Sequence, residues 1–387
     1  MRKTSPLKLS ICAVPLVIHS FFASADTTAD LMVGQIGQVV DTPVLRDTFE
    51  RMAKPLSEEL RKKALECYKA NQCETGTGGN ISIAYADGFG ENVWRKVTKM
   101  EYILQALTYP EIGKIQYVSA RGDVSKAISD MNAFIAQDVN VIILYPDSGS
   151  AMLPTVQEAT EAGIKVVLHN GPELGAPGKD YLTNVRENIC DLGVALVDAV
   201  KEGNPSVKDI VALGGTPGNS LSSKWQACAQ KEAVAKGVNI PTPLDTNWTQ
   251  EGAFTATSAA LAEYGEVKGW VYEYADGFRG AVRAYHAAQK PLNTVVALRT
   301  DEQGIFCDWE AAENPEFKIY YSSAYNITTR IALTAAMESL AGKPVPAEIE
   351  LPFHLKPAKK GLCNPDLPME TSISTTVDQK MLKAMFK

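Results

Sequence analysis

From residue 80 onward, short runs rich in β-branched and aromatic residues alternate with stretches in which apolar residues recur at helical spacing. The strand-like runs occupy residues 81–85, 115–119, 141–145, 164–168, 181–183, 210–213, 269–274, 294–298 and 317–322. Helix-like stretches separate most of them: Val124 to Ile135, Ala151 to Ala162, Ile189 to Val200, Ser222 to Lys236 and Thr255 to Glu263. This alternation predicts parallel sheets with helices on both faces. An interruption near residue 183 divides the strands into two such sheets.

The flanking regions follow other patterns. Residues 26–54 show no clear period, so we expect an irregular extension there. Pro55 to Ala70 has one apolar face opposite its charges, which predicts an amphipathic helix, and Gly76 to Gly79 is expected to be a short flexible linker. Glu348 to Phe353 forms another extended segment, and the tail ends in a short predicted helix over Asp378 to Phe386.

A five-residue phrase, Tyr-Ala-Asp-Gly-Phe, occurs twice, at residues 85–89 and 274–278. Each copy follows a strand-like run and precedes a helix-like one, with an Asp available to cap the helix and a Gly for the turn. Ligands of parallel α/β sheets bind outside the carboxyl ends of the strands, so we expect both copies to line one cleft. Because Asp-Gly is a common turn dipeptide, the alternative is that the repeat is a coincidence.

Length and charge restrict the class of protein. A chain of 387 residues exceeds what one hydrophobic core usually supports, so two domains are expected. Hydrophobic content of 45% and charged content of 21% are ordinary for a soluble globular protein. A formal charge of −7 and an isoelectric point near 5.4 argue against a nucleic-acid or anionic-membrane surface.

The N-terminus has the form of a secretory signal. Arg2, Lys3 and Lys8 precede an apolar run from Leu9 to Phe22, and residues 23–25 (Ala-Ser-Ala) match a cleavage site. We therefore expect residues 1–25 to be removed and the product to be exported and soluble. A lipoprotein is less favoured, because Cys12 lies early in the apolar run behind Ile11. No later stretch is long and apolar enough to cross a bilayer.

Six cysteines remain after the signal, an even number that suggests disulfides in an exported protein. They allow 15 pairings. Cys67 and Cys73 are close enough to favour a local loop, and for the rest we favour Cys307 with Cys363 and Cys190 with Cys228. Metal binding is the weaker alternative, because no Cys-x-x-Cys occurs and the histidines are scattered.

The sequence contains no pattern that demands catalysis. The nucleophile elbow G-x-S-x-G does not occur, and no carboxylate pair stands out. The loop of residues 214–219 lacks phosphate-binding spacing and is better interpreted as a turn that starts a helix. His169 could be a general base, but without a nucleophile we favour a hydrogen-bonded histidine at a strand end. We expect no cofactor.

Residues 80 to about 353 resemble the ribose-binding branch of the periplasmic sugar-binding proteins, the solute receptors of ABC importers. The resemblance rests on the order and spacing of short segments over some 270 residues. These are Asn92-Val93-Trp94, Asp123 with the following helix, Val141 to Ser148, Ala162 to Val167, Gly215 to Gly218, Asn247-Trp248, Gly280 to Ala284, and Asp301. Sugar-responsive repressors share this domain but carry a helix-turn-helix where this chain has a signal peptide.

The resemblance implies two similar doubly wound α/β lobes, joined by three crossings near Thr183-Asn184, Ser322-Ser323 and Phe353, with the ligand held in the cleft between them. After an extension over 26–79, lobe 1 would comprise residues 80–183 and 324–352, and lobe 2 residues 184–323 and 353–387. Hinge motion would close the lobes over the ligand. The expected partners are a carbohydrate-like small molecule and an ABC permease, which would supply the only membrane contact of a monomeric receptor.

The resemblance and the two Asp-Gly turns together give a set of candidate ligand-binding residues. They are Asp87, Phe89, Asn92, Trp94, Asp123, Asp147, Asn170, Trp225, Tyr274, Asp276, Asp301 and Ser323. Trp94 could stack on a ligand or pack on the sheet, and packing is the commoner fate of a single Trp. If both tryptophans belong to the site, Trp94 and Trp225 should meet across the ligand from opposite lobes.

Three of these positions depart from the resembling family. Asn170-Gly171 stands where its sugar binders usually have Asp-Arg, Trp225 where an Arg is expected, and Tyr274 where an Asn is usual. The pocket should therefore be more aromatic and less charged than a pentose or hexose site. We expect an exported receptor for a sugar, polyol or glycoside-like ring compound. The alternatives are an exported α/β enzyme on a carbohydrate-like substrate, and a periplasmic sensor for a chemoreceptor or histidine kinase.

Overall fold

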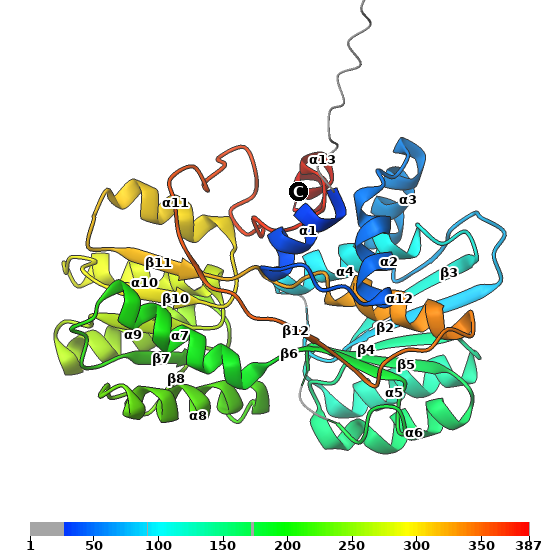
Figure 1. Ribbon diagram of the computed structural model, residues 1–387, viewed down its shortest axis with the longest axis horizontal. Helices are drawn as coiled ribbons and strands as arrows, with labels where there is room; N and C mark the ends of the chain where they lie inside the picture. Colours follow the sequence, from blue (N-terminus) through cyan, green and yellow to red (C-terminus); the bar gives the residue numbers. More distant parts are fainter. Residues whose placement is uncertain (1–26, 91, 172–173, 387) are drawn as a thin grey trace, which may run out of the picture.

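The computed structural model describes residues 27–90, 92–171 and 174–386. The expected signal peptide and its cleavage site lie outside the described residues. Two α/β lobes lie side by side, each built on its own mainly parallel sheet with helices on both faces (Figure 1). This arrangement confirms the predicted fold class. No helix of the described ranges is long and apolar enough to span a membrane.

The first lobe is built on a seven-stranded sheet. Across the sheet, the strands are β1 (Gln72–Glu74), β3 (Ile112–Ser119), β2 (Ile81–Asp87), β4 (Val141–Tyr145), β5 (Lys165–His169), β6 (Thr183–Glu187) and β12 (Glu348–Leu351). Only β1 pairs antiparallel. One face carries α4 (Val93–Ala106) and α12 (Thr328–Leu340); the other carries α5 (Val124–Ala136), the short helix η1 (Gly149–Met152) and α6 (Leu153–Glu161). Both faces are therefore buried, as parallel sheets require.

The second lobe is built on a six-stranded sheet. Its strands, in order, are β13 (Lys356–Pro357), β11 (Lys318–Tyr321), β10 (Val295–Leu298), β9 (Gly269–Tyr272), β7 (Val211–Gly214) and β8 (Leu244–Asp245). Helices α7 (Ile189–Gly203) and α8 (Ser220–Ala235) cover one face. Helices α9 (Gln250–Tyr264), α10 (Ala275–Ala287) and α11 (Gln303–Ala312) lie on the other.

The two sheets repeat one strand order. In the first lobe β3, β2, β4, β5 and β6 are neighbours in that order, and in the second lobe β8, β7, β9, β10 and β11 are. Both are the order second-first-third-fourth-fifth of a doubly wound sheet, in which ligands bind where the winding reverses. Strand β2 of the first lobe therefore corresponds to β7 of the second, and β4 corresponds to β9.

Three segments connect the sheets of the two lobes. Strand β6 leads into α7, residues 322–327 lead from β11 to α12, and residues 352–355 lead from β12 to β13. The last two crossings lie where they were expected. The first was placed too early: Thr183 and Asn184 lie inside β6, paired with β5 and β12, and the chain crosses after Glu187.

The N-terminal extension is helical, so the expectation of an irregular segment over 26–54 is wrong. Helices α1 (Thr27–Ile36) and α2 (Pro43–Ala53) precede α3 (Glu58–Lys69), the helix that was predicted. Thr42 caps α2 by accepting a 3.4 Å hydrogen bond from the Leu45 N–H, and Pro43 occupies the first turn. A polar N-cap residue followed by Pro signals the start of a helix, and the periodicity of apolar residues alone does not reveal it.

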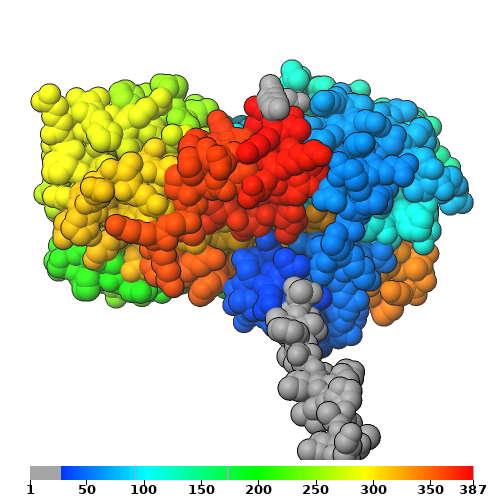
Figure 2. Space-filling view, turned by 90° about the horizontal axis from the view of Figure 1, so that it is seen from above, coloured from blue at the N-terminus to red at the C-terminus, as the bar shows by residue number. Residues whose placement is uncertain are grey.

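The C-terminal tail connects both lobes. Strand β13 pairs with β11, and Cys363 forms a disulfide with Cys307 of α11. The last helix, α13 (Gln379–Met385), instead packs on α3 beside the first lobe, although the whole tail was expected in the second. Figure 2 shows the N-terminal helices (blue) next to the C-terminal tail (red) on one face. The pairs Cys67–Cys73 and Cys190–Cys228 are also present, so all three predicted disulfides are confirmed.

Candidate functional site

A cavity with about 40 Å³ of accessible space lies between the carboxyl ends of the two sheets. Both lobes supply its walls. The first lobe contributes Phe89, Asn92, Trp94, Arg95 and Tyr145, and the second contributes Leu221, Trp248, Glu273, Tyr274, Arg299 and Thr300. We call it the aromatic cavity, because five of these eleven side chains are aromatic. Its position, at the carboxyl ends of two parallel sheets, is that of a small-molecule site.

Ring contacts shape the cavity from both sides. Phe89 of the first lobe meets Trp248 of the second edge to face, with ring centroids 5.1 Å apart and planes at 90°. Trp94 and Tyr145, both of the first lobe, have centroids 6.1 Å apart at 75°. Trp94 also donates a 2.6 Å hydrogen bond to the carbonyl of Ala324 in the second crossing. Thus Trp94 both packs and lines the cavity.

Trp248 is held in a strained backbone conformation. Its φ of 49° and that of Asn247, 55°, lie in the left-handed region, which a bulky residue adopts rarely. Such strain persists where surrounding structure enforces it, and it concentrates at binding sites. The neighbouring Gly215 makes room for the ring, because a Cβ there would lie 2.1 Å from it. Three residues that carried the family resemblance thus position one cavity wall.

Arg95 joins two carboxylates beneath the cavity. Its guanidinium donates a 2.6 Å hydrogen bond to Asp87 and bonds of 3.1 and 3.2 Å to Asp147, and it lies 3.6 Å from the centroid of Tyr145. Tyr117 donates to the other oxygen of Asp87 at 3.1 Å. Burial raises the pKa of Asp147 from 3.8 to about 7, which Arg95 only partly opposes. Asp87 thus holds Arg95 rather than facing the cavity.

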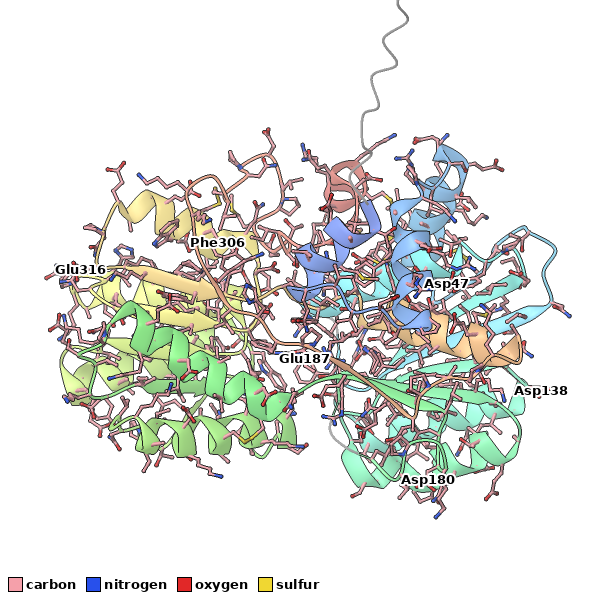
Figure 3. All side chains as sticks on the ribbon, viewed as in Figure 1. Asp47, Asp138, Asp180, Glu187, Phe306 and Glu316 are labelled. Atoms are coloured by element: carbon pink, nitrogen blue, oxygen red, sulfur yellow. A yellow bond between two sulfur atoms is a disulfide. The ribbon has the colours of Figure 1, made fainter. Side chains whose placement is uncertain are left out.

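A second ion pair connects the lobes at the cavity. Arg299, after β10, donates hydrogen bonds of 2.7 and 2.8 Å to both oxygens of Glu187, at the end of β6. Figure 3 shows Glu187 where the two lobes meet. Both residues are buried, and a bidentate pair of this kind is strong and geometrically restrictive. It fixes one guanidinium at the edge of the aromatic cavity.

Glu273 brings a buried carboxyl to the cavity. It is 2% exposed, and its Oε1 accepts a hydrogen bond from the Ser222 hydroxyl. Burial raises the pKa of this carboxyl, and Ser222, Arg299, Trp248 and Trp225 oppose that rise, the two tryptophans as hydrogen-bonding partners. The surrounding side chains thus hold the buried carboxyl at the cavity wall.

A larger cavity adjoins the first. Its accessible space is about 530 Å³, and its lining includes Asp147, Asn170, Glu187, Leu221 and Lys224. We call it the polar cavity, since Ser148, Ser150, Asn219 and Ser220 also line it. Leu221 belongs to both cavities, and two ion pairs connect them, because Arg95 and Arg299 line the aromatic cavity while Asp147 and Glu187 line the polar one.

Of the candidate residues predicted from the sequence, Phe89, Asn92, Trp94 and Tyr274 line the aromatic cavity, and Asp147 and Asn170 line the polar one. Asp87 supports the site through Arg95. The remaining five are placed elsewhere: Asp123, Trp225, Asp276, Asp301 and Ser323 line neither cavity.

Each of these five has a structural role instead. Asp123 is exposed and caps α5, and Asp276 accepts a 3.0 Å hydrogen bond from Gln250. Asp301 accepts hydrogen bonds from Ser372 and from the N–H of Ser374 in the C-terminal tail, and Ser323 donates to the Gln35 carbonyl of α1. The N- and C-terminal segments are thus the hydrogen-bond partners of Ser323 and Asp301.

Trp225 does not meet Trp94 across the cleft as expected. It is fully buried among Leu221, Ala229 and other apolar side chains under α8. Because α8 packs through this residue on its sheet, the ring is part of the core of the second lobe. The aromatic residue that the second lobe brings to the cavity beside Phe89 is Trp248.

Sequence reasoning overlooked most of the polar lining. The overlooked residues are Arg95, Tyr145, Glu273, Arg299 and Thr300, each within two residues of a residue that was chosen. Four of them share a signal of position: Tyr145, Glu273, Arg299 and Thr300 lie within two residues of the carboxyl end of a predicted strand, whereas Arg95 lies on the following helix. Charged residues directly after buried strands, such as Arg299, could have been found by that rule.

No group that would indicate catalysis or a metal centre emerges in the described parts of the chain. His169 is fully buried, its Nδ1 lies 3.2 Å from the Thr328 hydroxyl, and burial lowers its pKa well below the usual value. It lies against Tyr85 and Tyr145 as a core residue. No group of three or more His, Cys, Asp or Glu side chains that could hold a metal occurs among the residues described.

Comparison with known proteins points in one direction. A family model for the periplasmic binding protein domain matches residues 87–344. The chain is 25% identical over 202 residues to the xylitol-binding protein of Mycolicibacterium smegmatis, which covers 51% of this chain and 57% of that protein. It is 28% identical over 119 residues to the D-xylose-binding periplasmic protein of Escherichia coli, or 30% of this chain and 34% of the relative. The matches thus span about half and one third of these relatives.

Solved structures share the fold. An ABC transporter solute-binding protein from Agrobacterium vitis, solved with bound D-fucose, superimposes with a TM-score of 0.64 at 16% identity, covering 74% of this chain and 98% of that one. The likeness extends over nearly the whole of that structure. The match to the family model begins at Asp87 and ends at residue 344, so α1, α2 and α3 before it and the C-terminal tail after it lie outside the matched region.

Proposed function

The chain belongs to the periplasmic binding protein domain family, and from this premise we propose that it is an exported receptor that captures a sugar or polyol and delivers it to an ABC importer. The ligand would lie between the lobes and be held there when they close. Binding rather than turnover is its proposed role, and release to a permease is the step that follows.

The observation that carries the proposal is the aromatic cavity itself. Its two sides come from different lobes, and each side brings aromatic rings: Phe89 and Trp94 from one, Trp248 and Tyr274 from the other. Aromatic faces pack against the apolar faces of sugar rings, while groups such as Asn92 and Glu273 can bond hydroxyls. A ligand that contacts both walls would stabilise the closed arrangement of the lobes.

Names of relatives support the ligand class. The curated relatives are a xylitol-binding and a D-xylose-binding protein, and the structural neighbour holds D-fucose. All three compounds are small, neutral and polyhydroxylated. The cavity of this chain presents two guanidinium groups that are already ion-paired, which suits a neutral ligand better than a charged one.

Export and delivery follow from the same family and from the expected signal peptide. The disulfides Cys67–Cys73, Cys190–Cys228 and Cys307–Cys363 suit an oxidising compartment. A monomer suffices for the proposed role, because both walls of the cavity come from one chain.

The test is a thermal-shift screen of the mature protein against pentoses, hexoses and polyols, including D-xylose, xylitol and D-fucose, followed by calorimetric titration of the best compound. We expect a saturable rise in melting temperature, a change in tryptophan fluorescence, and recovery of the compound unaltered. Trp248→Leu should weaken binding at least ten-fold, which corresponds to about 1.4 kcal/mol.

Trp309→Leu is the matched control, because Trp309 lies on α11 outside the aromatic cavity. Equal affinities of both variants and the parent would show that ligand does not bind at this cavity. Conversion of the compound to a product would favour the enzyme alternative.

A further inference from the structure

The C-terminal tail lies across both lobes after its disulfide. Figure 2 shows this segment, in orange to red, between the second lobe and the N-terminal helices beside the first. We call residues 364–378 the strap, because they connect Cys363, which is bonded to Cys307 of α11, with α13, which packs on α3. The strap therefore begins on one lobe and ends on the other.

The first part of the strap is bonded to the second lobe. The N–H of Gln303, at the start of α11, donates a 2.8 Å hydrogen bond to the carbonyl of Thr371. Asp301, which is 1% exposed, accepts a hydrogen bond from the Ser372 hydroxyl and another, of 3.1 Å, from the N–H of Ser374. This part of the strap is therefore expected to move with the second lobe.

The next two residues are bonded to the first lobe. Glu101 of α4 is fully buried and accepts hydrogen bonds of 2.9 Å from the Thr375 hydroxyl and of 3.0 and 2.8 Å from the N–H and the hydroxyl of Thr376. Arg330 of α12 pairs with the same carboxylate and donates a 3.2 Å hydrogen bond to Thr376. Hydrogen bonds to a charged group are stronger than neutral ones. The strap thus passes from one lobe to the other between Ser374 and Thr375.

The strap also covers one of the crossings between the lobes. Residues 322–327 of this second crossing are all buried. The N–H of Ala324 donates a 3.3 Å hydrogen bond to the Ser374 hydroxyl, while the carbonyl of Ala324 accepts from the indole of Trp94. Hinge segments absorb the changes in φ and ψ when lobes rotate. This crossing is therefore held between the strap and a wall of the aromatic cavity.

We propose that the strap restrains the hinge: it holds the two lobes in contact, and the lobes separate only when its hydrogen bonds to one of them break. Because consecutive residues bond opposite lobes, little free chain lies between the two anchors to absorb a rotation. The disulfide Cys307–Cys363 fixes the second-lobe end covalently, so the bonds of Thr375 and Thr376 to Glu101 are the ones that open. The inference concerns how the lobes move and goes beyond the proposed function.

The test measures the distance between the lobes without ligand. Spin labels are attached to p-acetylphenylalanine, which leaves the disulfides intact, at the exposed positions Asn132 of α5 and Val234 of α8. Double electron–electron resonance then gives the distribution of distances between them. We expect a narrow distribution for the parent protein. The double variant Thr375→Val with Thr376→Val keeps the shape of both side chains but removes their hydroxyls, and it should broaden the distribution.

Hydrogen exchange at the second crossing is an independent measurement. In the double variant, the amides of residues 322–327 should exchange roughly five-fold faster than in the parent protein, because local opening exposes them. Ser374→Ala removes the acceptor for the N–H of Ala324 and should have a smaller effect in the same direction. Thr371→Val is the matched control. Its hydroxyl donates a 2.7 Å hydrogen bond to the carbonyl of Pro368 within the strap, so both measurements should stay as in the parent.

The outcomes decide whether the strap restrains the lobes or only packs against them. A folded double variant with the parent's distance distribution and exchange rates would overturn the proposal. A parent protein whose distribution is as broad as that of the variant would overturn it too. If the double variant does not fold, Ser374→Ala decides, and unchanged exchange at residues 322–327 would again refute the strap's role. Both measurements are made without ligand, so their result is independent of the proposed function.

Discussion

The two copies of Tyr-Ala-Asp-Gly-Phe form different structures although their residues are the same. In the first copy, residues 85–87 complete strand β2 and Gly88-Phe89 form the loop after it. In the second, Tyr274 precedes a helix and residues 275–278 are its first turn. One phrase therefore ends a strand and the other starts a helix, because β2 continues to the third residue of the first copy, whereas β9 ends at Tyr272, two residues before the second copy begins.

That shift exchanges the roles of the side chains. Tyr85 is fully buried inside the first lobe, whereas Tyr274 lines the aromatic cavity. Phe89 lines the cavity from the first lobe, whereas Phe278 is buried in the core of the second. Both copies contribute to one cleft, as expected, but through different members of the phrase.

The strand orders show that the copies are not equivalent positions of a duplicated lobe. Strand β2 is the first strand of its sheet and corresponds to β7, whereas β9, before the second copy, corresponds to β4. The lobes repeat a topology, and the phrase does not follow it. A shared pentapeptide is therefore weaker evidence for a shared role than a shared place in the sheet.

The largest difference between the copies should appear at their aspartates. Asp87→Asn removes a buried charge that Arg95 and Tyr117 contact, and breaking such a pair typically costs about 3–5 kcal/mol. Asp276→Asn keeps the acceptor for Gln250 and removes a charge whose pKa burial raises, so its stability should change by less than about 1 kcal/mol. Urea unfolding of both variants measures the difference, and equal losses would show that the two carboxylates are bound alike.

Much of the fold could be predicted, because buried parallel strands have a recognisable local sequence pattern. The runs around Val141 to Tyr145 and Val295 to Leu298 are continuously apolar, as strands covered on both faces must be. Helix α12 escaped notice because it is buried on nearly every side and lacks a polar face, so its apolar residues show little period. Helices α1 and α2 were not predicted because short helices depend on tertiary packing: α1 packs on α2, and α2 also packs on α12.

The site was less predictable, because the role of each polar residue depends on hydrogen-bond partners that are distant in the sequence. Asp301 looked like a ligand group after a strand, but residues of the C-terminal tail occupy it, and that tail is outside the region matched by the family. Trp225 looked like a cleft residue but faces inward from α8. Which side of a helix faces the cleft depends on how it packs, and a single sequence records that only weakly.

A smaller effect is expected from the surroundings of the second copy. Burial raises the pKa of Glu302 from 4.5 to about 8; its Oε2 accepts hydrogen bonds from Thr300 and from the N–H of Asp276. Because this pKa is higher in the folded than in the unfolded chain, stability should fall as the pH rises from about 5 to 8, by on the order of a few kcal/mol.

Glu302→Gln, which imitates the protonated acid, should reduce this loss, as measured by melting temperatures at pH 5 and pH 8. Exposed Glu316 provides the control Glu316→Gln. The measured quantity is the change in melting temperature between pH 5 and pH 8. If the parent protein melted higher at pH 8 than at pH 5, and by the same amount as both variants, the prediction would be contradicted.

Binding should distinguish the tyrosines of the two copies. Tyr274→Ala removes part of the cavity wall, and losing an aromatic contact of about 0.5–1.5 kcal/mol together with its buried area should weaken the best ligand of the screen roughly ten-fold. Tyr264→Ala is the control, because Tyr264 is exposed at the end of α9. Calorimetric titration gives both affinities, and unchanged binding by Tyr274→Ala would remove the second copy from the site.

The smallest effect is expected for the hydroxyl of Tyr85. The ring is fully buried between Tyr102, Tyr117 and His169, and its hydroxyl has no hydrogen-bond partner in the part of the chain that the structure describes. Tyr85→Phe deletes an unpaired polar atom and keeps the ring contacts, so it should leave stability unchanged or raise it by up to about 1 kcal/mol. Ligand affinity should be unaffected, because this tyrosine does not line the aromatic cavity. Urea unfolding and titration measure both quantities. A loss above 1 kcal/mol would mean that the first tyrosine of the phrase uses its hydroxyl after all, and that the copies differ less than their positions indicate.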